Sequence, residues 1–205
     1  FNRAVAHENF RDYELALEDY TRALTKDKDF TTVYLNRGNL YRKLGQAQKA
    51  IDDFTTAIER NRNGAAWNRN EVACMFNRGD VYLRLRRPEL AVRDFNEVIR
   101  QRPAFDKAYY NRAIAHSQLG QYQRAVEDCD QAIKLDPNHA IAYNNRGLAY
   151  SKLGEHERAI EDYDEAIRLN PQDAEAYYNR GDAYGDLDQY ERAIQDYDEA
   201  IRLNP

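Results

Sequence analysis

The sequence predicts an all-α fold, a right-handed superhelical solenoid of antiparallel helix pairs. The first observation behind this prediction is a repeat: ERAIEDYDEAIRLNP, at residues 157–171, returns as ERAIQDYDEAIRLNP at residues 191–205, a spacing of 34 residues. Recurrence at that period is typical of stacked structural units. The second observation is the apolar periodicity within each unit, which indicates two amphipathic helices joined by a tight turn.

A common numbering aligns the units when Ala174 is taken as position 1. Position 20 is then Ala in every unit, position 8 is Gly or Ala, and position 27 is Ala except for Val98. Such small residues let two helices cross closely, while large residues at positions 4, 11 and 24 fill the space beside the crossings. The chain is therefore expected to be a single array over 1–205, with an N-terminally truncated first repeat. The repeats are 1–30, 31–71, 72–105, 106–139, 140–173 and 174–205.

The repeated positions resemble those of the tetratricopeptide repeat family, over essentially the whole chain. In three of the repeats a Gly at position 15 is expected to end the first helix. These glycines are Gly45, Gly120 and Gly154. The resemblance implies that first helices line a concave groove and that the array binds a protein or peptide in it.

The register slips once, between the second and third repeats. About seven extra residues lie near 62–71, which is nearly two helical turns. We therefore expect the first helix of the third repeat to start early, near Ala65, and to carry Trp67. That Trp either packs on the preceding helix end or anchors a partner.

Composition and charge exclude several classes of protein. The formal net charge of −5 argues against a general nucleic-acid binder. No apolar run approaches membrane-spanning length, and no signal peptide is apparent, so a cytoplasmic location is expected. The two cysteines, Cys74 and Cys129, occupy helical core positions and are expected to be buried free thiols, which suits a reducing compartment.

The titratable residues do not form a catalytic pattern. His7 and His116 both occupy position 11, where other units carry Tyr, so core packing explains them better than catalysis. The carboxylates recur with the repeat and do not converge on one spot. The chain is therefore not expected to be an enzyme or to hold a cofactor or metal.

An Arg at position 7 and an Asp at position 23 recur in every unit. Position 7 lies along an otherwise apolar seam, so the guanidinium needs a partner there. The returning second helix brings position 23 within reach, so we expect repeated structural pairs, within a unit or between neighbours. These are Arg3, Arg37, Arg78, Arg112, Arg146 and Arg180 with Asp19, Asp53, Asp94, Asp128, Asp162 and Asp196.

An Asn at position 6 also recurs in every unit, and helical geometry points it away from the core. An amide donates and accepts, so a row of such side chains can hold the backbone of an extended peptide. This is similar to the asparagine ladder in the repeat domain of O-GlcNAc transferase. The alternative is that each Asn bridges adjacent first helices. The residues are Asn2, Asn36, Asn77, Asn111, Asn145 and Asn179.

Other groove positions are expected to select the partner. An apolar docking patch is expected from Ile114, Ile141 and Leu148, with Tyr110 beside them. Charge runs from +3 in each of the repeats 31–71 and 72–105 to −5 in the last repeat. This gradient could orient a charged partner segment between Lys43 and Arg84 at the front and Glu175, Asp182 and Asp186 at the back.

The expected function is a non-catalytic interaction scaffold that binds a peptide or partner segment in its groove. Two alternatives remain open. The final helix exposes Ile194, Tyr197 and Ile201, which favours a self-association module, by end-to-end pairing or dimerisation. The chain could also be the recruiting arm of a larger enzyme.

Overall fold

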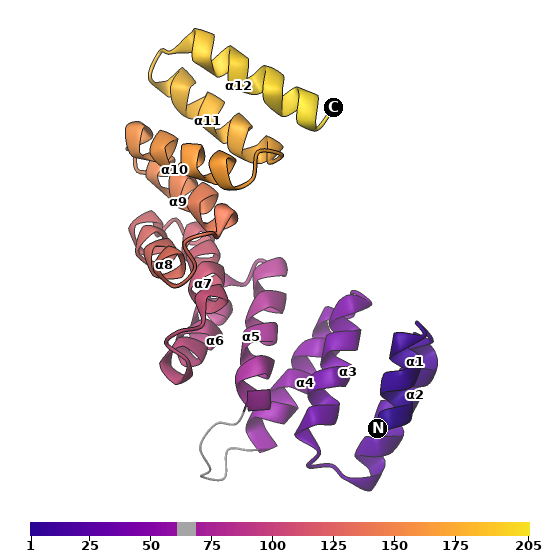
Figure 1. Ribbon diagram of the computed structural model, residues 1–205. Coiled ribbons are helices and arrows are strands. Elements are labelled where there is room, and N and C mark those ends of the chain that lie inside the picture. The colour runs from indigo at the N-terminus through magenta and orange to yellow at the C-terminus, as the bar shows by residue number, and fades with distance from the viewer. Residues whose placement is uncertain (61–68) are drawn as a thin grey trace. The chain divides into compact units, whose positions relative to one another are not determined.

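The computed structural model describes residues 1–60 and 69–205, and every regular element in those residues is an α-helix (Figure 1). Each predicted repeat contributes one first helix and one second helix. The helices are α1 (Asn2–Asn9), α2 (Tyr13–Lys26), α3 (Thr31–Lys43), α4 (Ala47–Arg60), α5 (Arg69–Arg84), α6 (Pro88–Gln101), α7 (Asp106–Gln118), α8 (Tyr122–Leu135), α9 (Ala140–Lys152), α10 (His156–Leu169), α11 (Ala174–Asp186) and α12 (Tyr190–Leu203).

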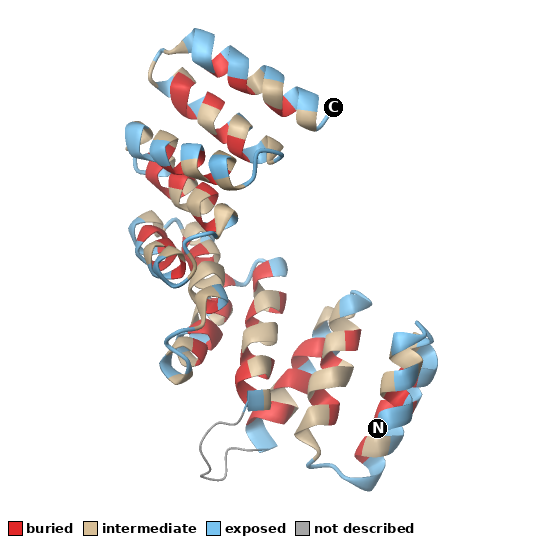
Figure 2. Cartoon of the chain, in the orientation of Figure 1, coloured by how far each residue is buried: buried red, intermediate tan, exposed pale blue. Residues whose placement is uncertain are grey.

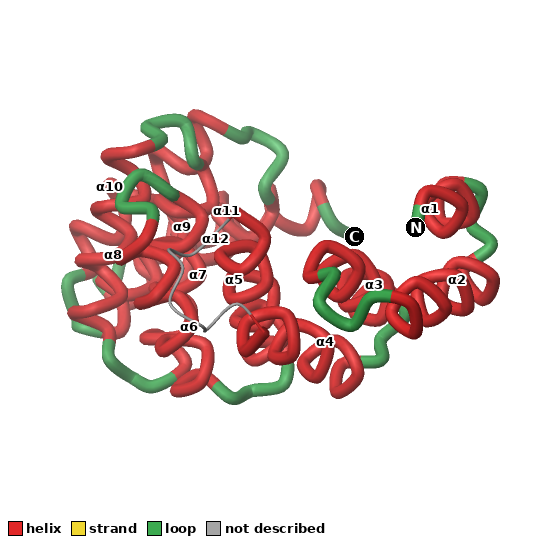
Figure 3. Tube along the Cα trace, turned by 90° about the horizontal axis from the view of Figure 1, so that it is seen from below, coloured by secondary structure: helices red, strands yellow, loops and turns green. Residues whose placement is uncertain are grey.

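The helices group into two compact units, residues 1–103 and 104–205. In each unit three helix pairs follow one another, and within each pair a short loop joins the two helices (Figure 3). Each first helix packs against the second helix of its own pair and, inside a unit, against the second helix of the preceding pair. The buried residues lie on these facing sides (Figure 2). The predicted α-helical pairing is confirmed.

Each first helix ends at position 13, and two residues later, at position 15, the backbone turns through a left-handed conformation. Three of these residues are the predicted glycines, with φ of 72° at Gly45, 71° at Gly120 and 80° at Gly154. Glycine adopts this conformation without steric cost. In the other repeats Arg11, Arg86 and Asp188 adopt it, with φ of 64°, 56° and 58°. The backbone of these three residues is therefore strained, which the sequence pattern did not indicate.

Close helix crossing within a pair depends on the small residue at position 8. A Cβ added to Gly147 would lie 2.7 Å from the ring of Tyr163, and one added to Gly79 would lie 2.8 Å from that of Phe95. Both aromatic side chains are at most 1% exposed. The ring at position 24 thus occupies the space that a side chain at position 8 would need.

Helix α5 begins at Arg69, three residues before Val72, the first position of the third repeat. The helix is therefore longer than the other first helices, and it is extended at its N-terminal end, where the extra residues lie. The expected start near Ala65 and the placement of Trp67 lie outside the described residues.

Both thiols lie in the core, as the sequence suggested. Cys74 and Cys129 are fully buried and unbonded to each other. Burial raises the pKa of each thiol to about 12. Among the described helices, none combines the length and the apolar character that crossing a lipid bilayer requires.

Candidate functional site

The Arg at position 7 and the Asp at position 23 meet within each repeat. In the fifth repeat, Arg146 donates from Nε to Oδ2 of Asp162 over 2.8 Å and from Nη2 to Oδ1 over 2.6 Å. The same two-bond fork joins the other pairs, from Arg3 and Asp19 to Arg180 and Asp196. This bidentate geometry satisfies a carboxylate that is nearly buried. Its hydrogen bonds raise the pKa of Arg146.

The remaining nitrogen of this guanidinium reaches the preceding repeat. Arg146 donates from Nη1 to Asp130 over 2.6 Å, and Arg180 donates to Asp164 over 2.5 Å. In unit 1–103 the acceptors are hydroxyls, Thr21 for Arg37 at 3.0 Å and Thr55 for Arg78 at 2.8 Å. One side chain therefore closes its own helix pair and also links it to the pair before.

These acceptors occupy position 25, which our sequence analysis did not single out. The signal was present, because Thr21, Thr55, Asp130 and Asp164 all carry an oxygen acceptor at that position. Which of these residues an Arg reaches depends on the offset between successive repeats, which the sequence of a single repeat does not encode. We call this contact the inter-repeat bond.

Two of the position-6 asparagines bond to the preceding repeat. Asn77 donates to Asn39 over 2.8 Å, and Asn179 donates to Asn144 over 3.0 Å. The bridging role that the sequence left open is therefore present in the structure at these two residues.

The asparagines differ in exposure along the chain. Asn2 is exposed, Asn179 is buried at 9%, and Asn36, Asn77, Asn111 and Asn145 are half-buried. Burial of Asn179 departs from the expectation that every position-6 amide faces outward. Its cause is the bond to Asn144, a buried Asn where other repeats carry a larger side chain at position 5. A half-buried amide bonded on one side keeps further donor and acceptor capacity.

The apolar groove positions of unit 104–205 remain accessible. Ile141 on α9 is 52% exposed, and Ile114 on α7 and Leu148 on α9 are half-buried. Leu148 also packs against the core of the unit. The ring of Tyr110 lies 4.9 Å, centroid to centroid, from that of His139. The predicted patch therefore has one outward apolar side chain, Ile141, and two half-buried ones, of which Leu148 also packs against the core.

The charged groove residues at the back are exposed and hold local partners. Asp182 accepts a hydrogen bond of 2.8 Å from the hydroxyl of Tyr197. Asp186 lies 3.3 Å from Nδ1 of His156. Each carboxylate is therefore held in place and still faces water.

The charged groove residues at the front, Lys43 and Arg84, lie in unit 1–103. The amino group of Lys43 lies 4.7 Å from the ring centre of Tyr13. Arg84 pairs with Asp80 at 3.2 Å.

The first helices of the two units differ in how they are joined. In unit 1–103, α3 and α5 are linked by Asn70 to Thr32, by Asn77 to Asn39, and by Arg42 to Asp80, all at 2.8 Å. Polar side chains on this face thus already bond to one another. The equivalent positions 2 and 9 of α9 carry Ile141 and Leu148. A partner would therefore meet apolar groups in unit 104–205.

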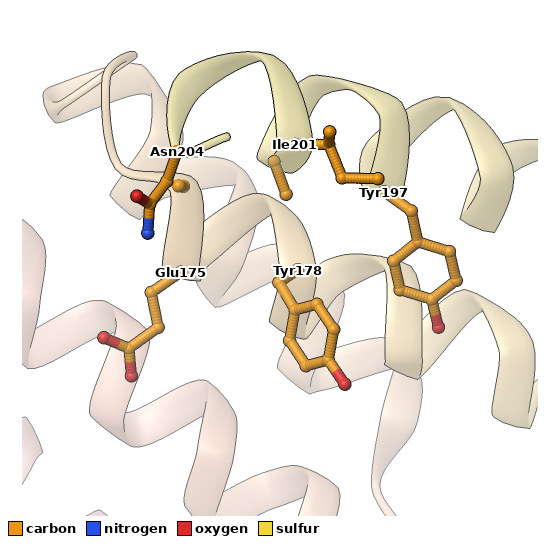
Figure 4. Close-up of a pocket in the computed structure, with 7 residues that line it drawn as sticks. Glu175, Tyr178, Tyr197, Ile201 and Asn204 are labelled. Atoms are coloured by element: carbon orange, nitrogen blue, oxygen red, sulfur yellow. The ribbon is translucent and has the colours of Figure 1, made fainter.

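A pocket of about 500 Å³ opens on α11 and α12, at the side of the last repeat that no other described helix covers. Figure 4 shows Ile201 and Tyr197 projecting from α12 toward Tyr178 on α11, with Glu175 and Asn204 at the other end. The rings of Tyr178 and Tyr197 lie 5.6 Å apart. The pocket combines an apolar floor with a carboxylate at its edge.

Comparison with solved structures identifies the class of protein as a helical repeat solenoid. A MamA protein matches at 26% identity, covering 86% of this chain and 92% of that one, with a TM-score of 0.74. A tetratricopeptide repeat protein from Parabacteroides merdae matches at 26% identity, over 100% of this chain and 77% of that one, with a TM-score of 0.69. YrrB, a TPR protein with an unusual peptide-binding site, matches at 22% identity over 92% and 94%, with a TM-score of 0.73.

Family models then give the membership. Tetratricopeptide repeat models match residues 29–104 and residues 106–139, 140–173 and 174–205. The chain belongs to the tetratricopeptide repeat family. The search of curated protein sequences found no match to this chain. The family and fold identify a protein-interaction scaffold.

Proposed function

We propose that the chain binds a peptide or partner segment on the first-helix face of residues 104–205, without chemistry of its own. The observation that carries this proposal is the exposure of Ile141, at 52%, on a helix face that also presents half-buried amides. Removing an exposed isoleucine side chain from water lowers the free energy, so a partner that covers it is bound more tightly.

The partner's chemistry follows from what flanks Ile141. Asn111 and Asn145, on successive first helices, each offer amide groups that match a main-chain peptide group. Glu175 and Asp182 on α11 are exposed carboxylates. The best partner is therefore an extended segment with an apolar side chain and a basic residue beside it.

The charge of unit 104–205 favours one direction for the bound segment. The three repeats of residues 106–205 carry net charges of −1, −3 and −5 in order along the chain. The basic end of the segment should therefore lie near α11. Such attraction chiefly raises the association rate and weakens as salt is added.

The experiment selects peptides from a random twelve-residue phage-displayed library on the full chain. The best enriched peptide is then measured by fluorescence anisotropy against three variants. Ile141→Asp should weaken binding at least tenfold, because it places a charge against an apolar side chain. Asn111→Ala with Asn145→Ala should weaken it about fivefold without altering the circular dichroism.

The control is Ile201→Asp, which lies on the last second helix and not on the first-helix face. It should bind the selected peptide as the parent chain does. Binding that survives Ile141→Asp would contradict the proposal. Asn179 is left intact, because its buried bond to Asn144 makes it part of the fold.

A further inference from the structure

We propose that the cleft between the first two repeats of unit 1–103 binds an acidic segment of a partner protein, by taking one aromatic side chain into a pocket beside a basic surface. This site lies at the turns that join paired helices, so it is separate from the first-helix face of residues 104–205. Three observations carry the proposal: a pocket between two packed repeats, exposed leucines in that pocket, and an excess of basic side chains next to it.

The pocket, of about 580 Å³, opens where the α1–α2 turn meets the α3–α4 turn. Its apolar lining comes from Tyr13, Leu15 and Leu17 on α2 and from Leu44, which follows α3. Helices α2 and α3 pack on each other, so the pocket lies between two repeats of the array and not at an end of it. Its size falls within the range of ligand-binding pockets, about 300–1,000 Å³.

The leucines of this pocket face water. Leu15, at position 19, is 47% exposed, and Leu44 is 36% exposed. In the last two repeats position 19 is an arginine that stacks on the tyrosine at position 11, as Arg158 does on Tyr150 with 3.9 Å between guanidinium carbon and ring centroid. The first repeat carries Leu15 and His7 at these positions. An apolar group therefore replaces a charged one, and covering it with a partner's side chain lowers the free energy.

The turns of the first three repeats lie side by side at one edge of the unit. The amino group of Lys43, at the end of α3, lies 4.7 Å from the ring centre of Tyr13, at the start of α2. Asp80 on α5 pairs with both Arg42, at 2.8 Å, and Arg84, at 3.2 Å. The first contact joins the second turn to the first turn, and the shared carboxylate joins it to the third.

This edge is basic. We call residues 11–14, 43–49 and 84–89 the basic edge; they contain six Lys or Arg side chains, all exposed, and three Asp or Glu side chains. The repeats 31–71 and 72–105 also carry a net charge of +3 each, so the longer-range field has the same sign. Such a surface attracts an acidic segment and repels a basic one.

The pocket and the charges together define the occupant. Glu14 lines the pocket, so the side chain that enters it should be uncharged, and an aromatic ring covers the most apolar area. Arg84, Arg86 and Arg87 gather at the third turn, whereas the pocket lies at the first. The carboxylates of the segment should therefore follow its aromatic residue over several positions.

A second copy of the chain is a poorer occupant than a separate acidic partner. Its acidic half is the last two repeats, where carboxylates already pair with arginines of their own helix. These pairs include Glu155 with Arg158, Glu165 with Arg168, and Glu199 with Arg202. Withdrawing a carboxylate from such a pair offsets part of the gain from a new one.

The test titrates the full chain with a short fluorescein-labelled peptide in which one phenylalanine precedes a run of glutamates. Fluorescence anisotropy should show saturable binding that weakens as salt is added. Leu15→Glu should weaken binding at least tenfold, because it places a charge in the pocket, and a peptide with serine for phenylalanine should lose about the same factor. Arg86→Gly should weaken binding about threefold. Glycine suits the left-handed backbone at this turn, so unfolding would not explain that loss.

The matched control is Lys26→Gln, which removes one exposed positive charge at the far end of α2. It and Ile141→Asp should bind the acidic peptide as the parent does, so failure of this site and failure of the first-helix face are seen separately. Equal affinity of Leu15→Glu and the parent would overturn the proposal. An equal loss in Lys26→Gln and Arg86→Gly, or no binding at millimolar peptide, would do the same.

Two further measurements test the other occupants. Phosphatidylserine vesicles or a single-stranded RNA that bind more tightly than the peptide, and lose binding in Arg86→Gly, would mean that the basic edge holds phosphates instead. Sedimentation that shows a dimer abolished by Leu15→Glu would mean that a second copy fills the pocket. Either result overturns the proposal, whereas a monomer that binds the peptide more tightly than vesicles or RNA supports it.

Discussion

At the residue scale, the arginine at position 7 does the most to define the structure. Its planar group makes two bonds to an Asp of the same repeat and a third to the preceding repeat, as Arg146 does with Asp162 and Asp130. A Lys could not supply this fork. The ring of Tyr143 adds a cation–π contact, with the guanidinium carbon 5.4 Å from its centroid.

Loss of the carboxylate should therefore be costly. Replacing Asp162 with Ala leaves a half-buried guanidinium with only part of its bonding, so the free energy of unfolding should fall by about 2–3 kcal/mol. The measurement is urea unfolding followed by circular dichroism. Glu161→Ala, an exposed neighbour on the same helix, should change it by less than about 0.5 kcal/mol. Similar midpoints for the two variants would refute a structural role for the pair.

The buried thiols give a pH dependence with a definite sign. The pKa of Cys129 is raised by burial to about 12, while that of an unfolded thiol is about 8.5. Between these values the unfolded chain binds fewer protons, so stability falls as pH rises. In Cys129→Ala that fall should be shallower by about 1.4 kcal/mol per pH unit between about pH 9.5 and 11. Parallel stability curves for parent and variant would contradict it.

At the element scale, each helix pair depends on the turn at position 15. Glycine suits the left-handed backbone there, yet Arg86 adopts it with a φ of 56°. The next helix begins at Pro88, whose ring is pre-set for a helical start.

A glycine at this turn should relieve the strain. Arg86→Gly should stabilise the chain by about 1 kcal/mol, measured by urea unfolding. The opposite change at an equivalent turn, Gly154→Ala with a φ of 80°, should destabilise it by a similar amount. If both substitutions shifted the midpoint in the same direction, backbone strain at position 15 would not be the cause.

The elements were predictable from the sequence because they depend on local periodicity. Ala and Gly at positions 8 and 20 indicated where helices cross, and Gly147 does pack against Tyr163. The bonds between repeats were not predictable in the same way. The acceptor role of Asp130 and the burial of Asn179 depend on the offset between neighbouring pairs, which no single repeat encodes. Whether Ile141 meets a partner stays a prediction.

At the scale of the whole molecule, two compact units, residues 1–103 and 104–205, carry different surfaces. In unit 1–103, polar side chains on neighbouring first helices bond to one another, as Asn77 does to Asn39. The first-helix face of unit 104–205 presents Ile141 among half-buried amides. We therefore expect recognition of a partner on the first-helix face to reside mainly in the second unit.

The inter-repeat bond also makes repeats interchangeable modules. Arg146 and Arg180 each reach an Asp at the same place in the repeat before, so excising residues 140–173 would bring Arg180 to Asp130 and restore an equivalent junction. The shortened chain should keep the same helical ellipticity per residue in circular dichroism, whereas a half-period excision of 140–156 should not. Lengthening or trimming by whole periods then changes the reach of the protein without redesigning any joint.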